Sequence, residues 1–144
     1  FLILNKQENA FIIVSDFTNF FDSLNHQYLK DRLKEILKVD TLPNDYYKIF
    51  KSITKYSYIE YNDILNELHL KHKELTKLHK ERLFDIEQFR KFKQGKVHGN
   101  KESYGMVQGS AISSVMSNIY MIKFDKLVND IVTSNNGIYR RYSD

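Results

Sequence analysis

Cysteine and tryptophan are absent from this 144-residue sequence, and proline occurs only once, at Pro43. Without cysteine, the chain has neither disulfides nor thiolate zinc sites. The first residues lack the basic and then apolar run of a signal peptide. Every apolar run is shorter than the roughly 20 residues that a membrane-spanning helix needs. The sequence therefore predicts a reduced, cytoplasmic setting and no membrane insertion.

The composition is that of a folded chain with a small basic surplus. Hydrophobic residues make up 42% and charged residues 28%, which is typical of globular proteins. Twenty-two Lys and Arg against eighteen Asp and Glu give a net charge of +4. Such a surplus suits a polyanionic partner such as nucleic acid, and a basic solvated surface explains it equally well. The length predicts one domain or part of one.

Two aspartates follow short apolar runs near the two ends of the chain. Residues 10–14 (AFIIV) predict a buried strand before Asp16, and residues 138–143 (IYRRYS) predict a strand that ends at Asp144. Neighbouring strands bring distant carboxylates together, and such a pair can hold two Mg²⁺ ions about 3.5–4 Å apart. An aspartate at a strand end is more often a turn or cap residue, so the interpretation depends on the residues around each one.

Apolar residues at spacings of three and four predict several helices between these ends. The pattern places helices at residues 28–37, 45–53 and 110–132, and one long or two shorter helices within 61–92. Asp22 or Ser23 is the expected cap of the first helix. Residues 95–103 predict a polar loop, and residues 135–137 a turn.

Three blocks of residues follow one another in a recognisable order. They are 16–22 (DFTNFFD), with an aromatic five residues after Asp16, then 105–110 (GMVQGS), which leads into a helix that carries Asn118, and finally 142–144 (YSD). In this order they resemble the first three palm motifs of the reverse transcriptase family, in which the third motif normally holds two adjacent aspartates. The ending and the helix residues are most similar to bacterial retron-like and abortive-infection reverse transcriptases.

This resemblance implies an α+β polymerase palm, with an antiparallel sheet backed by helices. A helical insertion at about 45–100 interrupts it, and residues 1–144 form a partial reverse transcriptase domain with the fingers and thumb incomplete or absent. The resemblance implies that Asp16 and Asp144 are catalytic and bind two Mg²⁺ ions together with the backbone carbonyl of Phe17. The backbone amides of Asn19 and Phe20 face the triphosphate.

The resemblance also implies roles for the residues that surround the incoming nucleotide. Phe21 lies under the sugar as a steric gate that selects deoxynucleotides, the alternative being an ordinary core aromatic. Gln108 and Gly109 line the nucleotide and template pocket, where glycine allows close approach of the backbone. Asp22 and Asp125 are interpreted as structural residues.

The implied activity is that of an RNA-directed DNA polymerase, a nucleotidyltransferase that adds deoxynucleotides to a primer end. It belongs to the full-length protein, and the fragment alone is expected to be inactive. The expected partners are an RNA template, a DNA primer and deoxynucleoside triphosphates, in a role in antiviral (phage) defence. The alternatives are a retron or group II intron type enzyme that copies a dedicated RNA, and a non-catalytic nucleic-acid-binding palm module.

The middle segment allows three further hypotheses, each with a simpler alternative. Its lysines and arginines, from Lys71 to Lys96, either contact phosphates or form a solvated face. His69, His72 and His79 are either metal ligands or surface residues. The apolar stripe at 64–78 is either a coiled-coil seam in an oligomer or packs within the chain.

Overall fold

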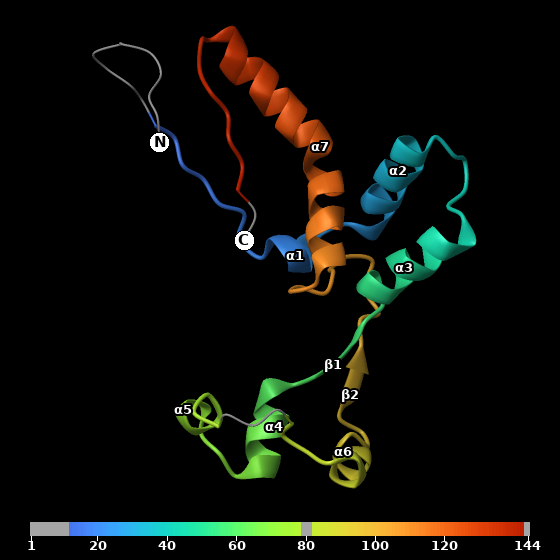
Figure 1. Ribbon diagram of the computed structural model, residues 1–144, viewed down its shortest axis with the longest axis vertical. Coiled ribbons are helices and arrows are strands. Elements are labelled where there is room, and N and C mark those ends of the chain that lie inside the picture. The colour runs from blue at the N-terminus through green and yellow to red at the C-terminus, as the bar shows by residue number, and fades with distance from the viewer. Residues whose placement is uncertain (1–11, 79–81, 143–144) are drawn as a thin grey trace.

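The computed structural model of the protein describes residues 12–78 and 82–142 (Figure 1). Within these ranges the fold is α+β, with helices and one small antiparallel sheet of two strands. No helix among the described residues is both long and apolar enough to cross a membrane. The elements, in chain order, are α1 (Phe20–Ser23), α2 (His26–Leu37), α3 (Asn44–Thr54), β1 (Ser57–Ile59), α4 (Tyr61–Leu68), α5 (His72–Leu75), α6 (Ile86–Phe92), β2 (Val97–Gly99) and α7 (Ala111–Ser134).

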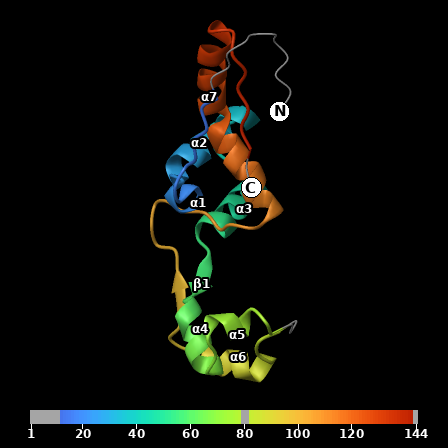
Figure 2. The ribbon, with the colours of Figure 1, turned by 90° about the vertical axis from the view of Figure 1, so that its left-hand side faces the viewer.

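The helices and strands form two lobes, which Figures 1 and 2 show from perpendicular directions. The upper lobe consists of described residues 12–56 and 100–142 and contains α1, α2, α3 and α7. The lower lobe consists of the described residues between β1 and β2 and contains α4, α5 and α6. The ribbon of β1 and β2 joins the lobes, with Ser57 paired to Gly99 and Ile59 to Val97. The lower lobe is thus an excursion that leaves and returns through adjacent strands.

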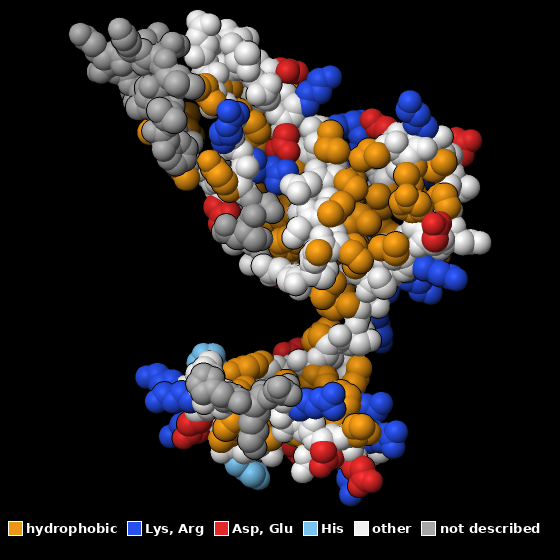
Figure 3. All heavy atoms as spheres, in the orientation of Figure 1, with side chains coloured by type: hydrophobic (Ala, Val, Ile, Leu, Met, Phe, Trp, Pro, Cys, Tyr) orange, Lys and Arg blue, Asp and Glu red, His pale blue; other side chains and the backbone are white. Residues whose placement is uncertain are grey.

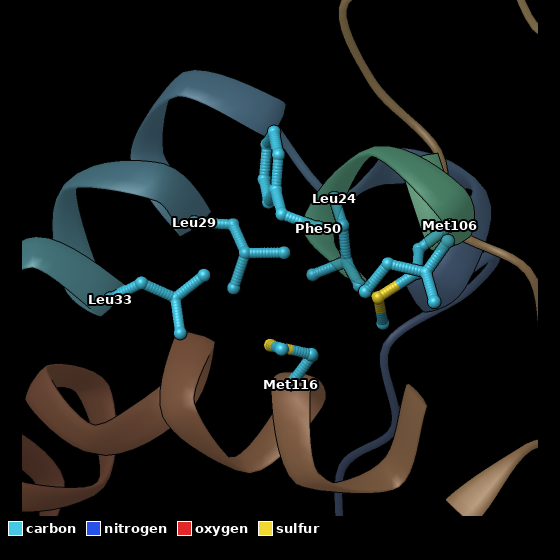
Figure 4. Packing of buried hydrophobic residues seen from close by; sticks show 7 residues of the cluster. Leu24, Leu29, Leu33, Phe50, Met106 and Met116 are labelled. Atoms are coloured by element: carbon cyan, nitrogen blue, oxygen red, sulfur yellow. The ribbon is translucent and has the colours of Figure 1, made fainter. Parts of the chain in front are cut away.

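The main hydrophobic core lies in the upper lobe, where α2, α3 and α7 meet (Figure 4). Leu29 and Leu33 are four residues apart on α2 and therefore project from the same face of the helix. Burial of each such leucine contributes about 1.5–3 kcal/mol relative to an exposed side chain. The buried members of the cluster are Leu24, Leu29, Leu33, Phe50, Ile53, Met106 and Met116.

The helices predicted at 28–37, 45–53 and 110–132 are confirmed as α2, α3 and α7. The predicted cap of α2 is wrong, because Asn25 accepts the hydrogen bond from Tyr28 N–H at 2.9 Å. Asp22 and Ser23 instead belong to the short helix α1, which the periodicity did not indicate. Ser110 caps α7, whose 24 residues span about 36 Å at 1.5 Å per residue.

The segment at 61–92 is neither one helix nor two, since α4, α5 and α6 all lie within it. His69 ends α4 in the left-handed conformation (φ 51°), so the helix cannot continue through it. The polar loop predicted at 95–103 contains β2, which is a further correction. Its three residues pair with β1 through the backbone, which a polar sequence permits as well as an apolar one.

The two strands expected beside the aspartates are not formed in the residues that the structure describes. Ile12, Ile13 and Val14 are 71%, 94% and 87% exposed and have no strand partner, and residues 138–142 are likewise outside any strand. A strand needs a neighbour to accept and donate its backbone hydrogen bonds, and an apolar sequence alone does not supply one. Residues 10, 11, 143 and 144 of these predictions lie outside the described part.

Candidate functional site

The first two sequence blocks lie side by side in the upper lobe. Met106 N–H donates to the carbonyl oxygen of Phe21 at 2.9 Å, and Gly105 N–H donates to that of Leu24 at 2.9 Å. An isolated antiparallel bridge pairs Asn25 with Tyr104. Segments about 80 residues apart in the sequence are therefore joined by backbone hydrogen bonds into one local unit.

His26 joins the same two segments through its side chain and its backbone. Its Nε2 lies 2.6 Å from the carbonyl oxygen of Gly105, and its backbone N–H donates to Ser103 at 2.9 Å. A carbonyl oxygen only accepts, so Nε2 carries the proton in this contact. The imidazole is 9% exposed and meets the ring of Phe50 edge to face. Sequence reasoning missed His26, because one histidine at the start of a helix carries no signal of a partner 79 residues away.

The turn at Gly105 depends on a backbone conformation that favours glycine. Its φ is +90°, and an added Cβ would lie 3.4 Å from both Asn100 Nδ2 and the carbonyl oxygen of Asp22. Asn100 Nδ2 donates to the carbonyls of Thr54 and Tyr104, at 2.9 and 3.0 Å. The turn is thus held to the end of α3 as well as to the first block.

Phe21, the predicted gate, is half-buried beside this turn. Its ring packs edge to face against Phe20 at 5.4 Å between centroids and lies against the hydrophobic core. Gln108 and Gly109 follow two and three residues after Met106, and both are exposed just before α7. Gly109 has φ +89°. The structure therefore brings Phe21 next to the turn that leads to Gln108 and Gly109.

The segment that carries Asp16 is attached to α7 by aromatic packing. Phe17 meets Phe124 of α7 edge to face at 5.4 Å, and it also contacts Phe20 at 5.9 Å between ring centroids. Asp16 is exposed, and its Oδ1 accepts from Phe17 N–H at 2.8 Å. Asn19 adopts the left-handed conformation (φ 53°) and places Phe20 as the first residue of α1. This contact network fixes the first block against the long helix.

Asp125, interpreted as structural, holds the segment that follows α7. Arg141 Nε donates to Asp125 Oδ1 and Oδ2 at 2.8 and 3.0 Å, and Arg141 Nη2 donates to Oδ2 at 2.9 Å and to Asn118 Oδ1 at 2.8 Å. Tyr139 OH donates to Asp125 Oδ1 at 2.7 Å. Burial raises the pKa of Asp125, but the hydrogen bonds from Arg141 and Tyr139 outweigh it and hold the pKa below its ordinary value. These contacts agree with the structural interpretation of Asp125.

The comparisons with known proteins give no family assignment. A scan against protein-family models found no match for this chain, and a search of curated proteins found no similar sequence. The functional interpretation therefore depends on the geometry of the chain's own residues.

Asp16 has the donor chemistry that a hard cation requires. Its carboxylate is exposed, and oxygen ligands of this kind are those that Mg²⁺ prefers. Asp144, its expected partner, lies outside the described residues. In residues 12–78 and 82–142, no three His, Asp or Glu side chains are grouped so as to hold a metal ion. Asp16 thus fits a ligand role as one member of a site.

Asp22 lines a hollow beside the β1–β2 ribbon, where the ribbon meets the upper lobe. The hollow has a volume of about 580 Å³ and is also lined by Tyr56, Tyr58 and Tyr104. Burial, and then the negative charge of Asp22, raise the pKa of Tyr56. Of the histidines proposed as ligands, His72 Nδ1 lies 2.8 Å from Tyr61 OH, and His79 is outside the described residues. On the face shown in Figure 3, Lys and Arg side chains are scattered over both lobes with Asp and Glu among them.

Proposed function

We propose that this chain is the palm of a reverse-transcriptase-type nucleotidyltransferase, which adds deoxynucleotides to a primer end. The observation that carries the proposal is the pair of backbone hydrogen bonds that join Phe21 to Met106 and Leu24 to Gly105. Two blocks that resemble separate palm motifs are therefore neighbours in the fold. If each resemblance were due to chance, the two blocks would not be expected to lie together. The proposed partners are a nucleic-acid primer and template and deoxynucleoside triphosphates.

In the proposed site, Asp16 and Asp144 would hold two Mg²⁺ ions, with the backbone carbonyl of Phe17 as a further oxygen ligand. Bound Mg²⁺ would lower the pKa of the attacking 3′-hydroxyl and neutralise charge on the leaving pyrophosphate. The protein itself contributes mainly by positioning these groups before the reaction.

The nucleotide would lie on the exposed side of the turn between Met106 and α7. The amides of Asn19 and Phe20 would donate hydrogen bonds to the triphosphate, which carries negative charge. The Phe21 ring would lie under the sugar and exclude a 2′-hydroxyl by contact. Gln108 and Gly109 would line the base and the template strand, where a residue without a Cβ permits close approach.

The decisive experiment replaces Asp16 by Asn in the full-length protein. Asp16→Asn keeps the side-chain volume and removes the charge, so Mg²⁺-dependent incorporation should be lost while the circular dichroism spectrum stays unchanged. Asp40→Asn, an exposed aspartate in the turn after α2, is the matched control and should retain activity. Incorporation at the wild-type rate by Asp16→Asn would refute the proposal. A wild-type protein that binds primer and template without extending the primer would instead indicate a non-catalytic binding module.

The resemblance to abortive-infection enzymes extends the proposal to a role in phage defence. Such an enzyme would extend DNA with or without a template, whereas a retron or group II intron type enzyme needs its RNA. Incorporation should therefore be measured with and without added RNA. A product that forms equally in both reactions favours the defence enzyme, and strict dependence on RNA favours the templated alternative.

A further inference from the structure

The hollow beside the β1–β2 ribbon has aromatic walls, and it lies where the ribbon meets the upper lobe in Figure 1. Tyr58 of β1 is directly paired with His98 of β2, and their ring centroids are 5.5 Å apart. Tyr56, two residues before Tyr58, lies on the same side of the extended chain, with 6.3 Å between the two ring centroids. Tyr104, from the loop after β2, also lines the hollow. The walls therefore present three tyrosine rings and one imidazole.

The loop on the other side of the hollow, residues 100–102, is held in place by hydrogen bonds within the chain. Asn100 N–H donates to the carbonyl oxygen of Tyr56 at 2.9 Å, and Glu102 N–H donates to Asn100 Oδ1 at 3.1 Å. Lys55 Nζ donates to the carbonyl oxygen of Glu102 at 2.6 Å. A ligand that enters a hollow with fixed walls loses less binding free energy to ordering of the protein.

The charged side chains around the hollow are mainly acidic. Asp22 and Glu102 line it, against the single ammonium group of Lys101. Among residues 12–78 and 82–142, neither carboxylate has an ion-pair partner. After burial, the charge of Asp22 is the next cause of the raised pKa of Tyr56, so the negative charge reaches the aromatic wall. The hollow is thus acidic in a chain whose net charge is +4.

Aromatic rings beside carboxylates are complementary to an organic cation. The face of a ring attracts a cation within about 6 Å, and a carboxylate that a ligand shields from water needs a charged or N–H partner. A guanidinium group meets both requirements, because its plane stacks on a ring while its N–H groups bind a carboxylate. A phosphate group would instead be repelled by both carboxylates.

The hollow is open to solvent along one side. The exposed fractions of Tyr58 and Tyr104 are 43% and 49%. Sites for small molecules usually bury most of the surface of the ligand. An open hollow is better suited to the end of a long side chain, whose backbone remains outside.

We propose that this hollow binds the guanidinium group of an arginine side chain from a partner protein. The guanidinium stacks on Tyr58 and donates hydrogen bonds to the carboxylates of Asp22 and Glu102. None of the described residues proposed to bind metal or nucleotide lines the hollow. The proposal is therefore independent of the polymerase activity, and either one can fail without the other.

The test measures binding of short blocked peptides to the full-length protein by saturation-transfer NMR. One peptide has a single arginine between glycines, and the other has citrulline, which keeps the shape of arginine without its charge. We expect the arginine peptide to bind at least about tenfold more tightly. Tyr58→Leu and Asp22→Asn should each weaken its binding by about 2- to 30-fold.

Two matched controls replace residues outside the hollow. Tyr46→Leu removes a tyrosine of similar exposure, 40%, from α3, and Asp40→Asn removes the same charge elsewhere. Both should bind the arginine peptide as the wild type does. Circular dichroism identifies any variant that fails to fold. Should Asp22→Asn fail to fold, Glu102→Gln replaces it in the comparison, because the hydrogen bonds of Glu102 involve its backbone.

Three results would overturn the proposal. The first is the absence of saturation transfer to the arginine peptide, and the second is equal binding of the arginine and citrulline peptides. The third is binding by folded Tyr58→Leu and Asp22→Asn proteins that matches binding by the controls. A short oligodeoxythymidylate serves as a competing probe. If its binding weakens in Tyr58→Leu while the arginine peptide does not bind, the hollow stacks nucleic-acid bases and the arginine proposal is wrong.

Discussion

The Nε2 of His26 lies 2.6 Å from the carbonyl oxygen of Gly105, and this contact joins the start of α2 to the turn before α7. Both residues are buried, and buried polar groups normally need a hydrogen-bond partner. The bond therefore holds together the two segments that contain Phe21 and Gln108. Its removal tests how much this one buried contact contributes to the stability of the fold.

Replacing His26 by Phe keeps an aromatic ring and leaves the Gly105 carbonyl without its donor. We expect the free energy of unfolding to fall by about 1–3 kcal/mol, the cost of an unsatisfied buried polar group. Urea denaturation of the chain measures this change. His98→Phe, on the exposed strand β2, is the control and should stay within about 0.5 kcal/mol of the wild type. Equal effects of the two substitutions would show that the His26 bond contributes nothing specific.

Phe21→Ala tests the steric gate in the full-length protein. Removing the ring opens the space that a 2′-hydroxyl would occupy, so discrimination against ribonucleotides should fall by about tenfold or more. The measurement is the ratio of kcat/KM for a deoxynucleotide to that for the matching ribonucleotide. Phe89→Ala, on α6, is the control for loss of an exposed phenylalanine. An unchanged ratio would assign Phe21 to the core alone.

Gly137→Ala tests the turn that reverses the chain after α7. A Cβ at residue 137 would lie 2.7 Å from Val132 Cγ1 and 3.1 Å from the Val132 carbonyl oxygen, so the turn has to shift. We expect a loss of about 1–3 kcal/mol in the free energy of unfolding, the usual cost of overpacking. Gly99→Ala, whose Cβ would meet nothing within 4 Å, should be nearly neutral in the same denaturation experiment. A destabilisation at Gly99 as large as that at Gly137 would contradict the steric explanation.

The carboxylate of Asp125 predicts a pH dependence of stability. Its folded-state pKa lies below the ordinary value of 3.8, so its charge stabilises the fold above pH 3.8 and this contribution disappears as the pH falls through the folded-state pKa. The stability difference between the wild type and Asp125→Asn should therefore be constant near neutral pH and shrink in acid. Urea midpoints from about pH 7 to about pH 2 give this difference. A difference that grows in acid would contradict the sign.

The helices α2, α3 and α7 were predictable from sequence because their signal is local. Apolar residues at spacings of three and four, such as Leu29 and Leu33, mark the buried face wherever its partner lies. The strands were not predictable, because their formation depends on a neighbour. Residues 12–14 have the composition of a buried strand, but no described strand lies beside them. Residues 97–99 lie in a polar sequence and still form a strand, because residues 57–59 pair with them.

The same distinction applies to the candidate site. Residues 16–22 and 105–110 were identified from their order and spacing, which are properties of the sequence. Two contacts hold these blocks in place, one between His26 and Gly105 and one between Phe17 and Phe124. They join residues that are 79 and 107 positions apart, so no periodic pattern in the sequence indicates them. Arg141 was identified only as part of the chain's ending, without a partner, and its bidentate contact with Asp125 required the structure.

The β1–β2 ribbon makes the length of the lower lobe independent of the geometry of the upper one. Ser57 and Gly99 are directly paired, so the chain departs and re-enters at a single place. An excursion of this kind can lengthen, shorten or be exchanged for another without pulling Phe21 and Met106 apart. Related proteins with very different numbers of residues between the two blocks would then share the local geometry of the upper lobe. The lower lobe itself could change in sequence and acquire new binding properties.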